Sequence, residues 1–265
     1  MPPKQVQLRY IREIVMLMLW FMYRLVSEKN IPFSVALTDY VDIYRKTAFF
    51  NLADDSDTQR LRPQWDECSA RLGKSFASHI SVGSPATQVE EEGLQLLWPH
   101  LVERIDRGLP LVEYRRDAMF GCFYYHVTKS VADLHFTNTI MPEAPLSDLA
   151  GRTRELYRLV LHCRQEHPET AQIKCGTWMN QYPPFRRLFP LSWKDSGERK
   201  SYNSLGWWGQ FVNHEGDIQG HNVAQFRATG NFPYQCTFHR CETKILEDYL
   251  SQIVKRLSPD QTLPG

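Results

Sequence analysis

The sequence predicts an α+β protein, in which a helical N-terminal region packs on a mixed β-sheet that is flanked by helices and contains one βαβ crossover. Apolar residues recur at helical spacing through most of residues 1–112. From residue 113 onward, segments rich in aromatic and β-branched residues alternate with loops and one amphipathic segment. We therefore expect a helical region, 1–112, and a sheet region, 113–265, with one continuous domain as the alternative.

The N-terminal region predicts four helices and two connecting segments. Helices are expected over residues 6–28, 35–50, 63–72 and 87–107, the last interrupted or restarted at Pro99, with a polar turn at 51–57 and a loop at 73–87. The loop is expected because residues 73–87 contain two Gly, four Ser and a Pro.

An apolar run, Ile14–Tyr23, lies within the first predicted helix. Ten residues are too few to span a bilayer, which needs roughly 20. Glu13 adjoins the run and no small-residue cleavage site follows it, which argues against a signal peptide. The run predicts a buried helix, with a subunit interface or a membrane surface as the alternatives.

A βαβ crossover is the central prediction for the sheet region. Ala118–Thr128 and Val131–Asn138 read as strands, and the few residues between them allow only an antiparallel hairpin. An amphipathic helix should begin after Ser147-Asp148 and end before Pro168. Ala171–Asn180 reads as the next strand.

The remaining elements are expected in a simple order. They are a helical turn at 185–189, a polar loop at 192–203, a strand at 205–213, a short helix at 221–229, a strand at 234–238 and a final amphipathic helix that carries Ile245 and Leu257.

Two short polar motifs end the strands of the crossover. They are Leu134-His135-Phe136-Thr137-Asn138 and Cys175-Gly176-Thr177-Trp178-Met179-Asn180. Ligand sites in open α/β sheets lie outside the carboxyl ends of the strands. We therefore expect His135, Asn138, Trp178 and Asn180 to line one concavity, together with at least one of Trp207, Trp208 and Gln210.

His135 is the first catalytic candidate. Strand alternation directs Leu134 and Phe136 to one face and His135 to the other. A buried histidine needs a hydrogen-bond partner, so His135 is a structural residue, a general acid/base or substrate-binding residue, or a metal ligand.

Aromatic and amide side chains supply the candidate binding residues. Trp178 can stack on a ligand and Asn180 can hydrogen-bond it, although a tryptophan in a core with its indole N–H satisfied is equally common. Adjacent tryptophans on a strand point to opposite faces, so either Trp207 or Trp208 can line the site. Gln210 would share a face with Trp208.

His239 and Cys175 complete the catalytic candidates. His239 is expected near the start of the final helix, where the helix terminus disfavours an imidazolium and would acidify Cys241. Capping or packing is the alternative for His239. A nucleophilic pair of Cys175 or Cys241 with a histidine stays open, because spatial proximity is not visible in a sequence.

Several functions lack support in the sequence. No dinucleotide or phosphate-binding glycine motif, GxSxG or HExxH occurs, and His126 and His135 are nine residues apart, so we expect no metal and no bound organic cofactor. The net charge of +1 gives no reason to expect nucleic acid. The six cysteines form no CxxC pair, which favours a reduced, cytoplasmic protein. Because the apolar run is too short to cross a bilayer, we expect no membrane span.

The leading functional hypothesis is an enzyme that acts on a small polar metabolite by group transfer or hydrolysis. Histidine acid/base chemistry would operate in a pocket lined by Trp, Asn and Gln side chains, without a cofactor or with a diffusible cosubstrate. The alternatives are a non-catalytic ligand-binding or regulatory module that uses the same pocket, and an interaction protein that docks through its N-terminal helix. That helix could also form a homo-oligomer.

Overall fold

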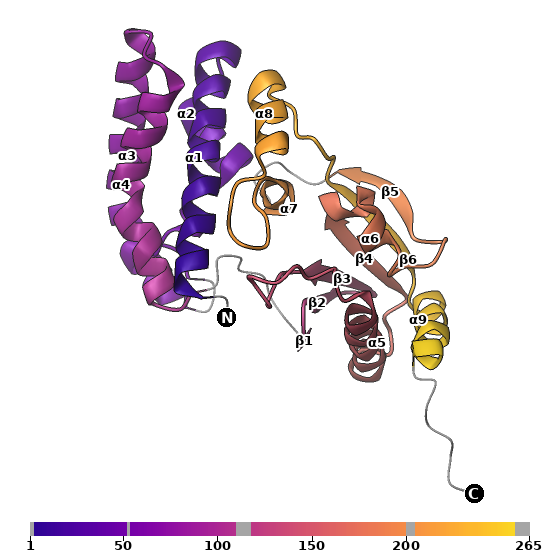
Figure 1. Cartoon of the computed structure of the whole chain (residues 1–265). Coiled ribbons are helices and arrows are strands. Elements are labelled where there is room, and N and C mark those ends of the chain that lie inside the picture. Colours follow the sequence, from indigo (N-terminus) through magenta and orange to yellow (C-terminus); the bar gives the residue numbers. More distant parts are fainter. Residues whose placement is uncertain (1–2, 52–53, 110–117, 200–204, 258–265) are drawn as a thin grey trace, which may run out of the picture. The chain divides into compact units, whose positions relative to one another are not determined.

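A computed structural model describes residues 3–51, 54–109, 118–199 and 205–257 (Figure 1). The α+β class is confirmed, with a six-stranded mixed sheet flanked by helices. The described residues form two compact units. The sheet unit lies within residues 115–200 and 234–265, and the helical unit within residues 2–114 and 201–233. Residues 205–233 therefore pack with the N-terminal helices, although the predicted division placed them in the sheet region.

The first helix, α1 (Lys4–Lys29), forms the centre of the helical unit. Its apolar run is buried inside the unit as expected: from Ile14 to Met22 only Met16 is not fully buried. Helix α4 (Ala86–Asp106) packs along α1, and α3 (Asp55–Ser81) packs on α4. No helix among the described residues is long and apolar enough to cross a membrane.

Two predictions for the helical unit are wrong. Helix α3 continues to Ser81, so the expected loop at 73–87 shrinks to residues 82–85. Buried side chains recur every three or four residues along α3 and outweigh the weak helix propensity of Gly and Ser. They are Leu61, Trp65, Cys68, Leu72 and Phe76. Helix α4 also continues through Pro99 without a break.

The segment predicted as one helix over 35–50 consists of three short pieces. They are α2 (Phe33–Val35), a π-helix η1 (Ala36–Val41) and a 3₁₀ turn η2 (Tyr44–Lys46). Asp42 has a left-handed φ of 48°, which ends the helix. The buried ammonium of Lys46 then donates to the carbonyls of Val41 and Asp42, which occupies acceptors that a continuing helix would use.

The predicted strand at 205–213 is also wrong, because these residues form α7 (Leu205–Trp208) and a 3₁₀ turn, η4 (Gly209–Phe211). Their aromatic composition resembles that of a strand, but these aromatic side chains pack into a cluster of rings. Trp208 and Phe211 pack against Phe226 of α8 (Gly220–Thr229) and against Phe232, and Phe21 of α1 contacts three of these rings. Tertiary packing thus overrides local β propensity.

The sheet unit has the strand order β1-β2-β3-β4-β6-β5. The strands are β1 (Ala118–Phe120), β2 (Phe123–Thr128), β3 (Val131–Phe136), β4 (Gln172–Thr177), β5 (Lys194–Arg199) and β6 (Thr237–Glu242). The hairpin of β2 with β3 is antiparallel and β3 runs parallel to β4, so the predicted βαβ crossover is confirmed.

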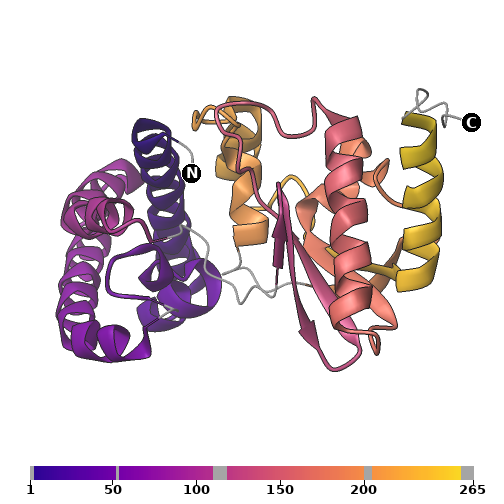
Figure 2. The same ribbon diagram turned by 90° about the horizontal axis from the view of Figure 1, so that it is seen from below.

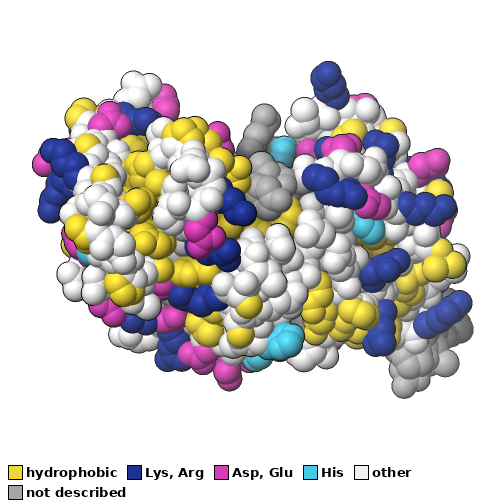
Figure 3. Space-filling view, turned by 90° about the horizontal axis from the view of Figure 1, so that it is seen from above, with side chains coloured by type: hydrophobic (Ala, Val, Ile, Leu, Met, Phe, Trp, Pro, Cys, Tyr) yellow, Lys and Arg dark blue, Asp and Glu magenta, His cyan; other side chains and the backbone are white. Residues whose placement is uncertain are grey.

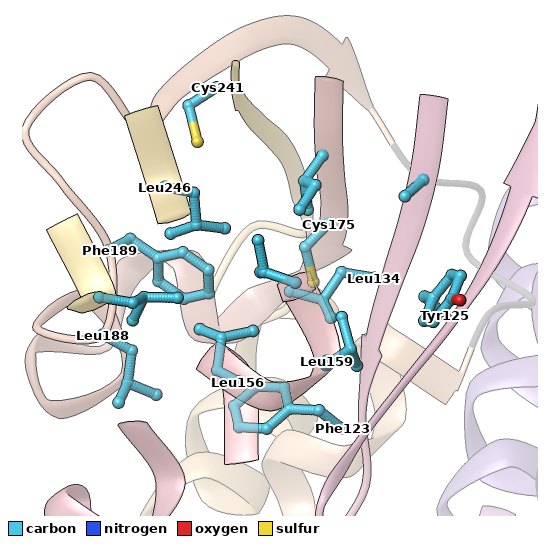
Figure 4. Packing of buried hydrophobic residues seen from close by; sticks show 14 of the residues in the cluster. Phe123, Tyr125, Leu134, Leu156, Leu159, Cys175, Leu188, Phe189, Cys241 and Leu246 are labelled. Atoms are coloured by element: carbon cyan, nitrogen blue, oxygen red, sulfur yellow. The ribbon is translucent and has the colours of Figure 1, made fainter. Parts of the chain in front are cut away.

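Helices α5 (Leu149–Glu166) and α9 (Thr243–Leu257) lie side by side on one side of the sheet (Figure 2). Asp148 caps α5 by accepting a hydrogen bond from the Gly151 backbone N–H, as the sequence predicts. Leu156 and Leu159 of α5 and Leu246 of α9 meet alternate residues of the strands in one hydrophobic cluster (Figure 4). We call this side of the sheet the covered face, and the other side the polar face.

Two strand assignments near the C-terminus need correction. The expected polar loop at 192–203 contains β5, and the expected strand at 234–238 is shifted to β6. Strand β5 is mostly exposed at the sheet edge, where charged residues such as Lys194 and Glu198 protect against further strand pairing. Its polar composition therefore resembles that of a loop.

Candidate functional site

Titratable side chains form a row across the polar face of the sheet. The pairing register places His126 of β2 opposite Asp133 of β3, and Asp133 opposite Lys174 of β4. Lys174 in turn lies opposite Arg240 of β6. Directly opposite residues project from the same face. Four charged or titratable groups from four neighbouring strands thus share this face.

His135 lies next to this row and is linked to it through His126. The His135 Nε2 and His126 Nδ1 atoms are 3.2 Å apart, which is a hydrogen-bond distance. The His135 ring also stacks on Tyr124 of β2, with 4.8 Å between ring centroids and 13° between the planes. Tyr124 is buried and both histidines are half-buried. The hydrogen bond requires complementary protonation of the two imidazoles.

Asp133 connects the histidine pair to Lys174. Its carboxylate oxygens lie 3.6 Å from His126 Nε2 and 3.7 Å from Lys174 Nζ. A carboxylate beside an imidazole helps to orient the ring. Asp133, His126 and His135 lie in this order, with an ion-pair distance between Asp133 and His126 and a hydrogen-bond distance between the two imidazoles. We call this series the relay.

Lys174 is one of the two positively charged residues of the row. Its ammonium lies 3.5 Å from the Glu198 carboxylate and 4.8 Å from the centre of the Phe238 ring. Gly176 makes room for that ring, because a Cβ at this position would come within 2.3 Å of it. Gly176 thus accommodates a neighbouring aromatic side chain.

The hairpin turn determines which residues reach His135. Thr128 pairs with Val131 across a two-residue turn, and Lys129 has a φ of 57° there. Each further pair moves one residue outward on both strands, which places Tyr124 opposite His135 and His126 opposite Asp133. Sequence reasoning missed Tyr124, Asp133 and Lys174 as site residues, although counting from this turn would have found the first two.

His239 and Cys175 lie on the covered face of the sheet. They are directly opposite one another in the β4–β6 register. His239 is within β6, not near the start of α9, so the expected effect of the helix terminus does not apply. Burial lowers the pKa of His239, although the Asp195 carboxylate opposes this shift. Cys175 is 2% exposed and lies within the hydrophobic cluster.

The expected acidic thiol of Cys241 is not observed. Burial raises the pKa of Cys241 to about 12, and the Glu242 carboxylate adds to this shift. Burial therefore acts against the acidification that the sequence analysis considered for Cys241.

The two predicted asparagines have their side-chain atoms engaged in local structure. Asn180 is 1% exposed; its amide donates to the carbonyls of Cys175 and Thr237, and its oxygen accepts from the Trp193 indole. Asn138 donates to the Glu143 carbonyl and accepts from the Ile140 N–H. Both side chains thus organise the chain beyond the ends of β3 and β4.

The predicted tryptophans fall into different units. Trp178, in the turn η3 (Trp178–Gln181) after β4, is half-buried and contacts Tyr182 and Tyr234. Trp207 and Trp208 are 2% and 0% exposed and belong to the helical unit. Gln210 is also buried there and donates to the Trp207 carbonyl. Of the predicted binding residues, Trp178 therefore has the most accessible aromatic side chain.

Metal and charge patterns add two observations. Within the part of the chain that the structure describes, no three His, Cys, Asp or Glu side chains come together to hold a metal ion.

On the face drawn in Figure 3, Lys and Arg side chains are interspersed with Asp and Glu. This mixture agrees with the small net charge of the sequence.

Comparison of the chain with protein-family models, curated proteins and solved structures finds no match. The chemistry of the site consequently has to be argued from its own geometry. That geometry comprises one relay of Asp133, His126 and His135, one neighbouring ammonium, and one accessible indole beyond the end of β4.

Proposed function

We propose that this protein is an enzyme that uses His135 as a general acid/base on a small polar substrate at the polar face of the sheet. The observation that supports this proposal most is the hydrogen-bond-distance contact between His135 and His126, with the Asp133 carboxylate on the far side of His126. A histidine oriented by a second group has a defined tautomer, which proton transfer requires.

Each residue of the row has a distinct role in this proposal. His135 exchanges a proton with the substrate, while His126 and Asp133 act as positioning residues that stabilise its charged form. Lys174 and Arg240 attract a carboxylate or phosphate group of the substrate, because they carry the positive charges of the row. Group transfer and hydrolysis both need such proton transfer, so either reaction fits the site.

A ligand-binding or regulatory module is the second candidate. It is favoured by Trp178, whose half-buried indole and two tyrosine neighbours can stack on a ligand whether or not a reaction follows. Docking or homo-oligomer formation through α1 has less support, because its apolar run is already buried within the helical unit.

Incubation of the purified protein with a cell extract, followed by untargeted metabolite profiling, tests the catalytic proposal. His135→Gln removes the titrating group and retains hydrogen-bonding capacity. His239→Gln is the matched control, because this histidine lies on the covered face of the sheet. We expect the wild type and H239Q to consume the same metabolite, and H135Q to consume it roughly 10²–10⁴-fold more slowly.

Three results distinguish the candidates. A folded H135Q variant with wild-type turnover would exclude His135 from the chemistry. Stabilisation of the wild type by an extract fraction, without any turnover, would favour the binding module. Loss of turnover that only parallels a lower melting temperature would assign His135 a structural role.

We also propose a cytoplasmic location. All six cysteines lie among the described residues, are buried and form no disulfide, as is typical of proteins in a reducing compartment. Fractionation of cells that express a tagged chain tests this, and recovery with the membrane or secreted fraction would contradict it.

A further inference from the structure

A second cluster of reactive groups surrounds Cys122, at the turn between β1 and β2. The guanidinium of Arg152, in the first turns of α5, donates from Nη1 to the Cys122 sulfur over 3.1 Å. The Thr139 hydroxyl lies 3.4 Å from the same sulfur. Two polar groups from separate segments thus converge on one thiol, which none of the roles proposed above uses.

Glu155 holds this cluster together. Its carboxylate accepts from Arg152 Nη2 over 2.6 Å and from the Cys122 backbone N–H over 3.0 Å. Gly121 permits this approach: its φ is +58°, and a Cβ there would lie 2.0 Å from the Glu155 carboxyl carbon. The guanidinium is therefore fixed in its orientation toward the sulfur, as is usual for preorganised sites.

Arg152 also has unused hydrogen-bonding capacity. The residue is 7% exposed, and its buried Nε–H has no hydrogen-bond partner among the described residues. A buried donor without an acceptor is costly, so the cluster favours a further acceptor oxygen.

We propose that Cys122 is a peroxide-reactive cysteine whose sulfur is oxidised to a sulfenic acid, with Arg152 and Thr139 as the groups that stabilise the reacting oxygens. Cys122 is 0% exposed, which excludes bulky electrophiles and selects a hydroperoxide as small as hydrogen peroxide. Neighbouring Gly121 is exposed and Thr139 is half-buried, so the sulfur lies one layer below the surface.

The reaction balances without another reactant. The thiolate attacks one peroxide oxygen, the S–O bond forms and the O–O bond breaks. The leaving hydroxide combines with the proton that the thiol released, so a thiol and hydrogen peroxide give a sulfenic acid and water. Sulfur is oxidised by two electrons and the peroxide oxygens are reduced by two.

Peptide mass spectrometry on the full chain tests the proposal. The reduced protein is exposed to hydrogen peroxide for increasing times, the remaining peroxide is removed, and the chain is then unfolded in the presence of dimedone, which traps sulfenic acids. Cys163 is the internal reference, because it is equally buried but lies in the hydrophobic cluster. We expect Cys122 to be trapped at least roughly tenfold faster than Cys163. Omission of dimedone and later addition of a dithiol should remove the added oxygen.

Three variants separate the roles of the neighbours. Arg152→Lys keeps the charge but loses the planar fork, and Thr139→Val removes only the hydroxyl; each should slow trapping at Cys122 several-fold. Arg154→Lys, an exposed site on the same helix, is the matched control and should trap like the wild type. If R152K does not fold, T139V decides the question. Trapping at Cys122 no faster than at Cys163, or at the wild-type rate in folded T139V, would overturn the proposal.

Discussion

His135 and His239 point to opposite faces of the same sheet. His239 lies opposite Cys175 on the covered face, whereas His135 shares the polar face with Asp133 and its partner Lys174. A sheet separates these faces by its full thickness, so the two histidines do not act on one substrate. The two histidines that the sequence predicts as catalytic candidates therefore lie at separate places, and the histidine in contact with His135 is His126.

Replacement of Asp133 by Asn should lower turnover without removing it. The amide retains the shape of the carboxylate but cannot stabilise a positive charge on His126, whose Nε2 lies 3.6 Å away. We expect kcat to fall by roughly tenfold or more, and by less than in H135Q, with KM nearly unchanged. Steady-state kinetics on the metabolite identified by profiling measures this. A D133N enzyme with unchanged kcat would remove the relay from the mechanism.

Replacement of Asn180 by Ala should reduce stability. The variant leaves the carbonyls of Cys175 and Thr237 and the Trp193 indole without their buried partner. We expect a loss of about 3 kcal/mol in the free energy of unfolding, measured by urea titration. Asn138→Ala, in a half-exposed loop, is the control and should cost less. A stable N180A protein that binds substrate weakly would instead restore Asn180 to the binding site.

The ion pair of Arg227 with Glu90 should be important for the helical unit. Arg227 donates to both carboxylate oxygens of Glu90, which is 1% exposed, and its guanidinium also lies over the Trp20 ring. Replacement of Arg227 by Met would leave a buried carboxylate unpaired.

We expect R227M to lose about 2 kcal/mol of unfolding free energy, less than fully buried pairs lose, because the Arg227 side chain is 36% exposed. The double variant E90Q/R227M should recover part of this loss. A chemical denaturation series measures both values. Equal stability of R227M and the wild type would show that the pair contributes little.

Cys241 should make the protein less stable in alkali. Burial raises the pKa of its thiol to about 12 from a model-peptide value of 9.0. Between these two values the unfolded chain releases the proton and the folded chain retains it. The contribution of the Cys241 thiol to the free energy of unfolding is therefore fully present below pH 9.0 and decreases as the pH rises toward about 12.

The wild type should thus lose up to about 1.4 kcal/mol per pH unit more than Cys241→Ala above the unfolded-state pKa. Comparison of the two pH slopes cancels the contributions of other groups, such as Lys46, whose pKa burial lowers to about 8. Unfolding titrations at several alkaline pH values measure the slopes. Parallel curves for the two proteins would contradict the expected effect.

The sequence by itself determined the elements whose signals are local. The hairpin, the helix that begins after Asp148 and the following strand were predictable because a short turn, a capping residue and strand alternation act within a few residues. The alternation also predicted correctly that Leu134 and His135 face opposite sides.

Only the tertiary structure decided the features that depend on distant residues. The segment around Trp208 is helical because rings from α1 and α8 surround it, which its own β-like composition does not reveal. The side chain of Asn180 is unavailable to a ligand because it forms hydrogen bonds with Trp193 and Thr237, which are distant in the sequence. Lys174 lies opposite Asp133 because β3 and β4 pair in parallel, although α5 separates these two strands in the sequence. Register between distant strands is set by packing of the whole sheet, and the polar row follows from that register.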